Sequence, residues 1–268
     1  MKNKWGGHWT HQLFVEKPYL FLPFLLARKK QGVKEAASIA TILKGLGVKR
    51  GGRILDLCCG IGRISVPLAK KGFNVVGVDL SPDYIRRARN YAKSKNATAR
   101  TKFAVGDYRQ IGPAIAKEEP FNGILSTFTS TGYYGKEADV SAFSQLAKHT
   151  MKGGVFVVET INRDWLVRHF EKRGWQMAGN VLLLEDRRFD AERAYMVNRW
   201  EYFRVIGANL IPEGVYEVDH RVYSPTELSE IMESTGWKVR SIARNLEGDQ
   251  IDLRSSTDSR VVIVAQRR

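Results

Sequence analysis

The chain contains little of what builds a disulfide-rich or metal-bound protein. Its 268 residues include only two cysteines, Cys58 and Cys59, which are adjacent. Adjacent cysteines cannot form a disulfide framework, and without a second pair they do not complete a zinc site. We therefore expect both to be small core residues at the end of a buried strand, and we predict no metal site.

Long apolar runs are also missing. The longest run near the N-terminus, PYLFLPFLL, is far shorter than the roughly 20 residues that cross a bilayer, and it lacks the small-residue cleavage site of a signal peptide. We expect no membrane span and a cytoplasmic protein. The sequence has no internal repeat, low-complexity tract or Gly/Ser linker, and 43% of its residues are hydrophobic, so we predict one folded unit with a sizeable core.

Acidic residues are too few to balance the basic ones. The chain has 28 Asp and Glu against 43 Lys and Arg, which gives a formal net charge of +15. Such a charge suits nucleic acid, anionic lipid, or a phosphorylated or carboxylated small molecule as a partner. The basic residues are spread along the chain and mostly mixed with acids, so a solvated basic surface explains the charge equally well. We treat the segment EDRRFDAER as such a solvated turn.

Between residues 53 and 161 the sequence alternates β-branched runs with helical patterns. This alternation is typical of a parallel sheet with crossover helices. One helix has a clear start, because Ser81 can cap it and Pro82 occupies its first position. We predict strands at 53–57, 74–79, 101–105, 121–127 and 155–160, and helices near 63–71, 82–94 and 137–149.

Beyond this segment the pattern changes. Residues 180–224 alternate apolar and polar side chains, with turn signals at Asp190 and at 212–214, which predicts two or three antiparallel strands. An amphipathic helix follows, with a capping-box start at Ser224. Two closing strands are predicted at 237–242 and 259–266, and the polar residues 245–259 between them are expected to be mobile.

The N-terminal residues combine aromatic side chains with an amphipathic stretch at 33–46. We expect them to form helices that lie over the domain, and plain packing against the sheet explains the aromatic residues as well as any specific role. The aromatic residues concerned are Trp5, Trp9, Phe14, Tyr19, Phe21 and Phe24.

The stretch RILDLCCGIGRISVPLAKKGFNVVGVDLS, residues 53–81, predicts a ligand site. A strand with Asp56 at its end, a turn through Gly60 and Gly62, and a helix from Arg63 place backbone amides at the carboxyl end of the first strand, where open α/β sheets bind ligands. The dinucleotide fingerprint needs a third small residue three positions after its second glycine. Ser65 stands there, so the NAD pattern is incomplete.

Three acids at three successive strand ends describe one ligand. Asp56 can receive an ammonium group, Asp79 can accept two ribose hydroxyls in a bidentate arrangement, and Asp107, with Tyr108 beside it, can accept the exocyclic amine of adenine. Each acid has a plainer explanation on its own: Asp56 as a turn tether, Asp79 as a helix cap, Asp107 as a turn residue. Together they indicate a ligand with an amino acid, a ribose and an adenine in a row.

The chain resembles the class I S-adenosylmethionine-dependent methyltransferases. The resemblance lies in ILDLCCGIGRISVPLAKKGFNVVGVDLS, FAVGDYRQI, FNGILSTFTSTGYY and MKGGVFVVET, and it covers roughly residues 50–162. The family usually has Asp-x-Gly-x-Gly-x-Gly in the first motif, whereas Cys58 replaces its first glycine here. The resemblance implies S-adenosylmethionine as the cofactor and these residues around it: Asp56, Cys58, Gly60, Gly62, Arg63, Asp79, Leu80, Gly106, Asp107, Tyr108 and Ser126.

The resemblance also implies a fold. We expect a Rossmann-like, doubly wound α/β sheet of about seven strands, mostly parallel with an antiparallel last strand. We divide the chain into an N-terminal helical lid at 1–48, a cofactor-binding core at 49–162 and 224–268, and an antiparallel β insertion at 163–223 over the acceptor pocket. The lid aromatics could form a cage for a cationic methyl group.

Methyl transfer from a sulfonium is an in-line displacement, so much of the rate comes from positioning. A general base helps when the acceptor must lose a proton. Side chains able to do this lie in three places: Tyr133 and Tyr134, Glu159 and Asn162, and His220. We take Tyr133 and His220 as the catalytic candidates, although a lone histidine on a strand is more often a packed group.

The N-terminal helices and the insertion are similar to those of small-molecule members of the family, the glycine N-methyltransferase-like and amino-sugar N-methyltransferase-like enzymes. The segment STFTSTGYY lacks the Asn-Pro-Pro-Tyr motif of nucleic-acid amine methyltransferases. We expect transfer to N or O of a small molecule, with Arg199, Arg204 or Arg221 meeting an anionic one. Three alternatives stay open: a tRNA methyltransferase that uses the basic surface, a non-catalytic cofactor-binding module, and, less favoured, an NAD oxidoreductase. The acceptor's identity and the oligomeric state do not follow from the residues.

Overall fold

The structure, a computed structural model, describes residues 7–248 and 259–268. Trp5, and most of the polar segment 245–259 that was expected to be mobile, lie outside the described residues. Among the helices of the described ranges, none is both long enough and apolar enough to cross a membrane.

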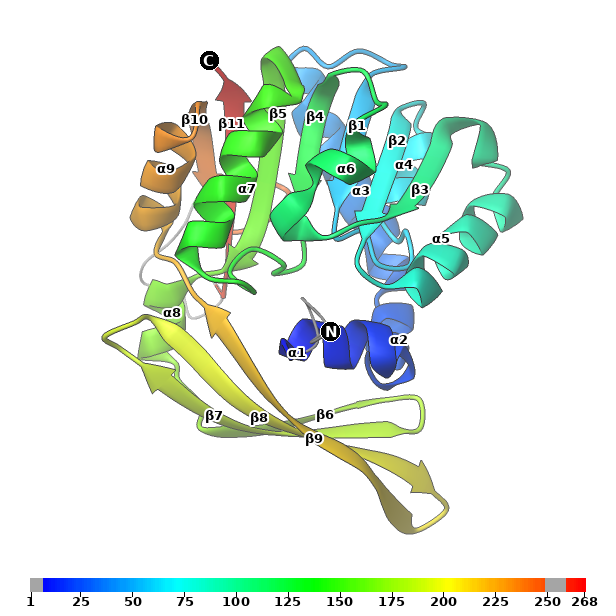
Figure 1. The fold of residues 1–268 in the computed structure, drawn as a ribbon, viewed down its shortest axis with the longest axis vertical. Helices are drawn as coiled ribbons and strands as arrows, with labels where there is room; N and C mark the ends of the chain where they lie inside the picture. The colour runs from blue at the N-terminus through cyan, green and yellow to red at the C-terminus, as the bar shows by residue number, and fades with distance from the viewer. Residues whose placement is uncertain (1–6, 249–258) are drawn as a thin grey trace, which may run out of the picture.

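A seven-stranded sheet forms the body of the molecule (Figure 1). Its strand order is β10-β11-β5-β4-β1-β2-β3. The pairs among β1 to β5 are parallel, and β11 is antiparallel to both of its neighbours, which confirms the predicted sheet and its antiparallel last strand. The strands are β1 Arg53–Leu57, β2 Asn74–Asp79, β3 Thr101–Val105, β4 Phe121–Ser126, β5 Thr150–Ile161, β10 Trp237–Ala243 and β11 Arg260–Arg267.

Helices cover both faces of this sheet, because the strands are apolar on both sides. On one face Ile39 and Leu43 of α3 pack with α4 and α5 against strand residues such as Ile54. On the other face α7 and α9 place Phe143 and Met232 against Phe156. The helical segments of the body are α3 Lys29–Gly45, α4 Ser65–Lys70, α5 Pro82–Ser94, η2 Thr98–Arg100, η3 Tyr108–Gln110, α6 Gly112–Ile115, α7 Lys136–Lys148, α8 Arg163–Arg168 and α9 Pro225–Ser234.

The structure contains both predicted helix caps, Ser81 and Ser224, but not the predicted capping box. Ser81 caps α5 through the backbone N–H of Tyr84, as expected. Ser224 caps α9 by accepting from the backbone N–H of Glu227 at 3.1 Å. The Glu227 carboxylate, however, contacts arginines instead of closing the expected capping box.

The insertion is a second sheet of four strands in the order β6-β7-β8-β9. Residues 180–224 form three of these strands, which confirms the predicted two or three, whereas β6 precedes that segment and was not predicted. The expected turn at 212–214 is wrong: the chain turns at 207–208, and Pro212 lies inside β9. An edge strand tolerates proline, and the pairing of β8 with β9 shifts register between Tyr202 and Phe203, opposite this proline. The strands are β6 Arg173–Ala178, β7 Val181–Asp190, β8 Tyr195–Ile206 and β9 Asn209–Arg221.

The first helices lie between the two sheets (Figure 1). They are α1 Trp9–His11, a π-helical turn η1 Gln12–Glu16, and α2 Pro18–Ala27. Trp9 and Leu20 pack against Leu183, Tyr202 and Val218 of the insertion. Helix α3 instead belongs to the layer that covers the large sheet. The segment beneath the inserted sheet thus ends near residue 28.

Candidate functional site

The turn after β1 adopts left-handed backbone conformations. The φ angles of Cys58, Gly60 and Gly62 are 55°, 55° and 75°. A side chain at Gly62 would press on Ala88 of α5 at 3.2 Å, whereas one at Gly60 would meet only Leu25 at 3.8 Å and would extend into the pocket described below. Gly62 therefore allows close helix packing, and Gly60 leaves room for a ligand.

Asp79 organises this turn from the end of β2. Its Oδ2 accepts a hydrogen bond from the backbone N–H of Gly60 at 2.8 Å, and its Oδ1 accepts from the backbone N–H of Ser81 at 2.9 Å. Burial raises the pKa of Asp79 to about 6. Each carboxylate oxygen keeps further lone-pair capacity, so the group can still accept two hydroxyls.

Asp56 lies at the end of β1 and is buried. The hydroxyl of Ser65 donates to its Oδ2. Burial raises the pKa of Asp56 also to about 6. Ser65, which broke the dinucleotide fingerprint, thus has a polar partner beneath the turn.

These groups open into one pocket, which brings together eight of the eleven predicted cofactor residues. The aromatic residues of its wall come from the N-terminal helices, α5, η3 and the loop after β4. Of these, Tyr84 and Phe128 had not been singled out from the sequence. The eight predicted residues in the lining are Asp56, Cys58, Gly60, Arg63, Asp79, Leu80, Gly106 and Tyr108; further lining residues include Phe14, Phe21, Leu25, Tyr84, Phe128, Tyr133 and Tyr134.

The other three predicted residues do not line the pocket. Gly62 packs against α5. The carboxylate of Asp107 binds the guanidinium of Arg109, with contacts of 2.6 and 3.0 Å, so its expected contact with adenine would compete with an ion pair. Ser126 is buried, and its Oγ lies 3.0 Å from Oγ1 of Thr131.

A second cavity of about 670 Å³ lies between the inserted sheet and the body of the molecule. Helix α2, the loop after β4, helix α8, the start of β11 and strands β6 to β9 contribute to its wall. Phe21, Phe128 and Tyr133 line both this cavity and the pocket. The two spaces therefore meet at a wall of three aromatic side chains.

The loop that forms part of this wall is strained. Phe128 and Thr129 have φ angles of 61° and 67°, which bulky or β-branched residues rarely adopt. Glu159 holds the strained pair: its Oε2 accepts from the backbone N–H of Phe128 at 3.0 Å, and its backbone oxygen accepts from Thr129 at 3.2 Å. Glu159, proposed as a base candidate, is thus occupied in shaping the loop.

His220 and Tyr133 face each other in the cavity wall, with ring centres 5.2 Å apart and an edge-on orientation. Nε2 of His220 lies 3.0 Å from the backbone oxygen of Thr131, so this nitrogen carries the proton. Burial lowers the pKa of His220 to about 4, and burial raises the pKa of Tyr133 to about 12. Near pH 7 the imidazole is neutral, with its lone pair on Nδ1, and the phenol is protonated.

The remaining base candidates have other partners. Tyr134 lies 3.0 Å from the hydroxyl of Thr10, and burial raises its pKa beyond that of a free phenol. Asn162 caps α8 by accepting from the backbone N–H of Asp164 at 3.1 Å. Among the described residues, no group of three His, Cys, Asp or Glu side chains is arranged to hold a metal ion.

Three buried polar atoms of β8 have no hydrogen-bond partner among the described residues. They are Oδ1 of Asn198, Nε1 of Trp200 and the hydroxyl of Tyr202. Asn198 and Trp200 line the cavity. The side chains are two residues apart and so point to one face of the strand. Buried polar groups normally have partners, so the first two are candidates for contact with a ligand.

The three arginines expected to meet an anionic acceptor lie elsewhere. Arg199 and Arg204 are exposed and pair with Glu201 and Glu213. Arg221 is buried, but its guanidinium is already bound by the backbone oxygens of Ala194 and Val222 and by Glu227. None of the three lines the cavity.

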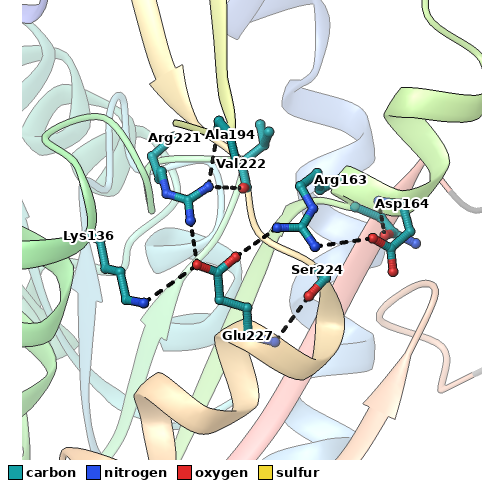
Figure 2. Close-up of polar contacts among 9 residues, drawn as sticks. Lys136, Arg163, Asp164, Ala194, Arg221, Val222, Ser224 and Glu227 are labelled. Atoms are coloured by element: carbon teal, nitrogen blue, oxygen red, sulfur yellow. Dashed lines mark hydrogen bonds and ion pairs between the residues drawn. The ribbon is translucent and has the colours of Figure 1, made fainter. Parts of the chain in front are cut away.

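Glu227 of α9 fixes the insertion to the body (Figure 2). Its carboxylate binds Arg221 at the end of β9 and Arg163 at the start of α8, the latter at 3.0 Å. Lys136 of α7 lies 3.7 Å away. Residues of four elements thus meet at the Glu227 carboxylate. His220 precedes Arg221 in β9, so it lies next to this contact in the chain.

Comparisons with known proteins agree with this geometry. Residues 54–154 match the family described as "Methyltransferase domain". The chain is 33% identical over 97 residues to a 23S rRNA (uracil(1939)-C(5))-methyltransferase of Neisseria lactamica, a match that covers 36% of this chain and 22% of that protein. It is 28% identical over 224 residues to a ubiquinone biosynthesis O-methyltransferase of Sinorhizobium fredii, covering 81% and 74%. The chain spans less than a quarter of the length of the rRNA methyltransferases it matches.

Solved structures share most of the fold. An S-adenosylmethionine-dependent methyltransferase of Clostridium acetobutylicum superimposes with a TM-score of 0.74 at 17% identity, covering 87% of this chain and 91% of the other. A sugar N-methyltransferase of a Streptoalloteichus species gives a TM-score of 0.68 at 16% identity, covering 91% of each chain. Coverage of 87% and 91% of this chain extends well beyond residues 54–154.

Proposed function

Because the chain belongs to the class I S-adenosylmethionine-dependent methyltransferases, we propose that it transfers a methyl group to N or O of a small molecule held in the 670 Å³ cavity. One observation carries the proposal: the pocket and the cavity share Phe21, Phe128 and Tyr133. The cofactor and the acceptor would therefore meet where the two spaces adjoin, as an in-line transfer requires.

The residues of the pocket fit the cofactor. The open side of Gly60 leaves space for it, the Asp79 carboxylate would accept its ribose hydroxyls, and the Asp56 carboxylate would face its ammonium group. Gly106 and Tyr108 would border its adenine. When bound, S-adenosylmethionine supplies a methyl group on a positively charged sulfur. The acceptor's lone pair would take this methyl group as the carbon–sulfur bond breaks, with S-adenosylhomocysteine as the leaving group.

We assign the acceptor side to the loop after β4 and the inserted sheet. The Tyr133 hydroxyl orients the acceptor, and neutral His220 receives the proton that an amine or hydroxyl must lose. The division of the chain into a lid at 1–48, a core at 49–162 and 224–268 and an insertion at 163–223 is part of this proposal, with α1 to α2 as the part of the lid that borders both spaces.

A calorimetric titration tests the cofactor. We expect S-adenosylhomocysteine to bind the wild-type protein in the micromolar range, Asp79→Ala to lose that binding, and NAD to give no heat. Binding of NAD in preference, or no heat with S-adenosylhomocysteine, would overturn the assignment. A mass-shift search in a cell extract then identifies the acceptor, and binding without turnover on any acceptor pool would indicate a non-catalytic cofactor-binding module.

RNA is the second candidate acceptor, favoured by the net charge of +15. The RNA methyltransferase relatives support it only within the domain they share with this chain. Salt-sensitive binding of tRNA together with methylation of that tRNA would establish this alternative. The cavity between the two sheets favours the small molecule.

A further inference from the structure

Three guanidinium groups gather around one aromatic ring at the wall between the two spaces. The guanidinium carbons of Arg28, Arg63 and Arg260 lie 4.9, 4.8 and 5.7 Å from the ring centre of Phe128. Arg28 follows α2, Arg63 belongs to the glycine turn, and Arg260 begins β11. The fold thus assembles this cluster from three distant parts of the chain.

The charges of this cluster are only partly balanced. Arg63 pairs with Glu35, and the Glu159 carboxylate is held by the backbone N–H of Phe128. Within the described ranges, neither Arg28 nor Arg260 has an ion-pair partner within 4.0 Å, and the buried Nη1 of Arg260 has no hydrogen-bond partner. Burial lowers the pKa of Arg28, and the neighbouring charges of Arg260 and Arg63 lower it further.

The three arginines face different spaces. Arg63 lines the cofactor pocket, whereas Arg28 and Arg260 line the cavity. Arg28 is exposed and Arg260 is half-buried, and the buried Nη1 of Arg260 has no partner among the described residues. A buried guanidinium nitrogen without a partner is costly, and the planar set of donors matches a carboxylate or phosphate in a bidentate arrangement. An anion at this end of the cavity would satisfy both arginines and reduce their mutual repulsion.

We propose that Arg28 and Arg260 form an anion site beside Phe128, and that the methyl acceptor is a small molecule carrying a carboxylate or phosphate that binds there. This inference rests on the proposed function. The anionic group binds at the Phe128 end of the cavity and thereby sets which atom of the acceptor reaches the shared wall.

Anion binding is tested without knowing the acceptor. Protein saturated with S-adenosylhomocysteine is titrated with inorganic phosphate or with acetate at constant ionic strength, and its unfolding temperature is measured. We expect one of the two probes to raise that temperature in the wild type and not in Arg28→Ala or Arg260→Ala; the probe that acts tells phosphate from carboxylate. Arg173→Ala is the control, because it removes one positive charge from a side chain that is 80% exposed.

Turnover tests the acceptor itself. Small molecules from a cell extract are separated on an anion exchanger and incubated with the enzyme and methyl-labelled S-adenosylmethionine. We expect the label in the fractions that the exchanger retains. KM for that acceptor should be at least tenfold higher in Arg28→Ala and Arg260→Ala, because a charge-assisted hydrogen bond is worth about one to two factors of ten in affinity, and Arg260→Lys should recover part of the loss. The value of kcat and the Kd of S-adenosylhomocysteine should stay within about twofold of wild type.

The outcomes separate this inference from the proposed function. Label in a neutral or cationic small molecule, or unchanged KM in both variants, would overturn the anion site and leave the small-molecule methyltransferase intact. A loss of S-adenosylhomocysteine affinity in the arginine variants would show that they bind the cofactor's carboxylate instead. Equal stabilisation by phosphate in wild type and variants would also overturn the site, whereas the absence of label in every small-molecule fraction would contradict the proposed function itself.

Discussion

Nε2 of His220 donates to the backbone oxygen of Thr131 across 3.0 Å and so joins the inserted sheet to the loop that follows β4. Three residues before Thr131 lies Phe128, and two residues after it lies Tyr133, both in the wall shared by the pocket and the cavity. The hydrogen bond uses one ring nitrogen and leaves Nδ1 as an acceptor. The same side chain can therefore hold the loop and take part in the reaction.

Two substitutions at His220 separate these roles. Gln can still donate to the oxygen of Thr131 but offers no basic nitrogen, whereas Ala does neither. We expect both His220→Gln and His220→Ala to lower kcat by about 100-fold, the scale of general-base catalysis, while the Kd of S-adenosylhomocysteine stays near that of wild type. Steady-state kinetics and calorimetry measure the two quantities.

A purely structural histidine predicts a different pattern. In that case His220→Gln would restore most of the activity that His220→Ala loses. Because the pKa of His220 is lowered to about 4, we also expect no change in activity from its ionisation between about pH 5.5 and 8. An inflection near pH 6.5 that disappears in His220→Gln would contradict the buried, neutral imidazole.

Cofactor affinity should depend on pH through Asp79 and Asp56. Burial raises the pKa of both to about 6, so each becomes protonated as the pH falls through about 6 and loses capacity to accept from hydroxyls or an ammonium group. We expect the Kd of S-adenosylhomocysteine to rise steeply below pH 6, by up to tenfold per pH unit for each carboxyl group. Calorimetry between about pH 5 and 8 measures this.

The sign of the linkage shows that protonation of Asp79 and Asp56 does not itself destabilise the fold. A carboxyl whose pKa is higher in the folded than in the unfolded state contributes stability below its unfolded value, and the contribution disappears as the pH rises through about 6. Protonation of Asp79 therefore favours the fold while it weakens binding. Asp79→Asn should bind more weakly at pH 8 and show a shallower pH dependence, and an unchanged slope would assign the effect to Asp56 alone.

Most of the large sheet could be predicted from the sequence, because strand and helix patterns are local. The strands at 53–57, 74–79 and 101–105 and the helix at 82–94 match the structure. Strand β6, RGWQMA, was missed although Trp175 and Met177 are two residues apart. Both side chains are exposed and only Ala178 is buried, so the strand is defined by its pairing with β7 rather than by a buried apolar face. The misplaced turn came from Pro212, whose position on an edge strand depends on strand order, which local sequence does not encode.

The same limit applies to the site. Pocket residues that follow β1 and β2 were predictable, because motifs at strand ends occupy one edge of a parallel sheet. Arg28, Asn198 and Arg260 had no signal: each lies in an ordinary segment, and only the packing of α2, β8 and β11 brings them to one cavity. Asp107 was predicted from its motif to contact adenine, but in the structure its carboxylate forms an ion pair with Arg109.

Cys58 has a backbone conformation in which a Cβ atom is unfavourable and lowers the stability of the fold. Its φ angle of 55° is left-handed, a conformation that costs a residue with a Cβ about 1 to 2 kcal/mol. We expect Cys58→Gly to keep or raise the free energy of unfolding by up to about 1 kcal/mol, because the relieved strain exceeds the added entropy of the unfolded chain. Cys58→Val should lower it by about 1 to 2 kcal/mol, since β-branched residues resist this conformation. Urea denaturation measures both, and equal stabilities of the two variants would mean that the turn relaxes.

Glu227 should influence acceptor binding from a distance. Glu227→Gln leaves the buried Arg221 and the half-buried Arg163 without their shared anion, and we expect it to lower the free energy of unfolding by about 2 kcal/mol. Since the insertion is then less firmly oriented, KM for the acceptor should rise while the Kd of S-adenosylhomocysteine stays unchanged. Glu201→Gln is the matched control, because its partner Arg199 is exposed. A variant that loses cofactor affinity and acceptor affinity equally would mean general unfolding rather than a displaced insertion.

Tyr202 and Tyr223 are both fully buried, but their hydroxyls have opposite surroundings. The hydroxyl of Tyr223 donates to the buried carboxylate of Asp139 at 2.5 Å, whereas that of Tyr202 has no partner among the described residues. Removing an unpaired buried hydroxyl relieves its desolvation cost, and removing a paired one leaves the partner unsatisfied. We therefore expect Tyr202→Phe to raise the free energy of unfolding by about 1 kcal/mol and Tyr223→Phe to lower it by about 2 kcal/mol, as measured by urea denaturation. If Tyr202→Phe instead lowers stability, its hydroxyl has a water partner, and the polar face of β8 that begins at Asn198 and Trp200 in the cavity continues to Tyr202.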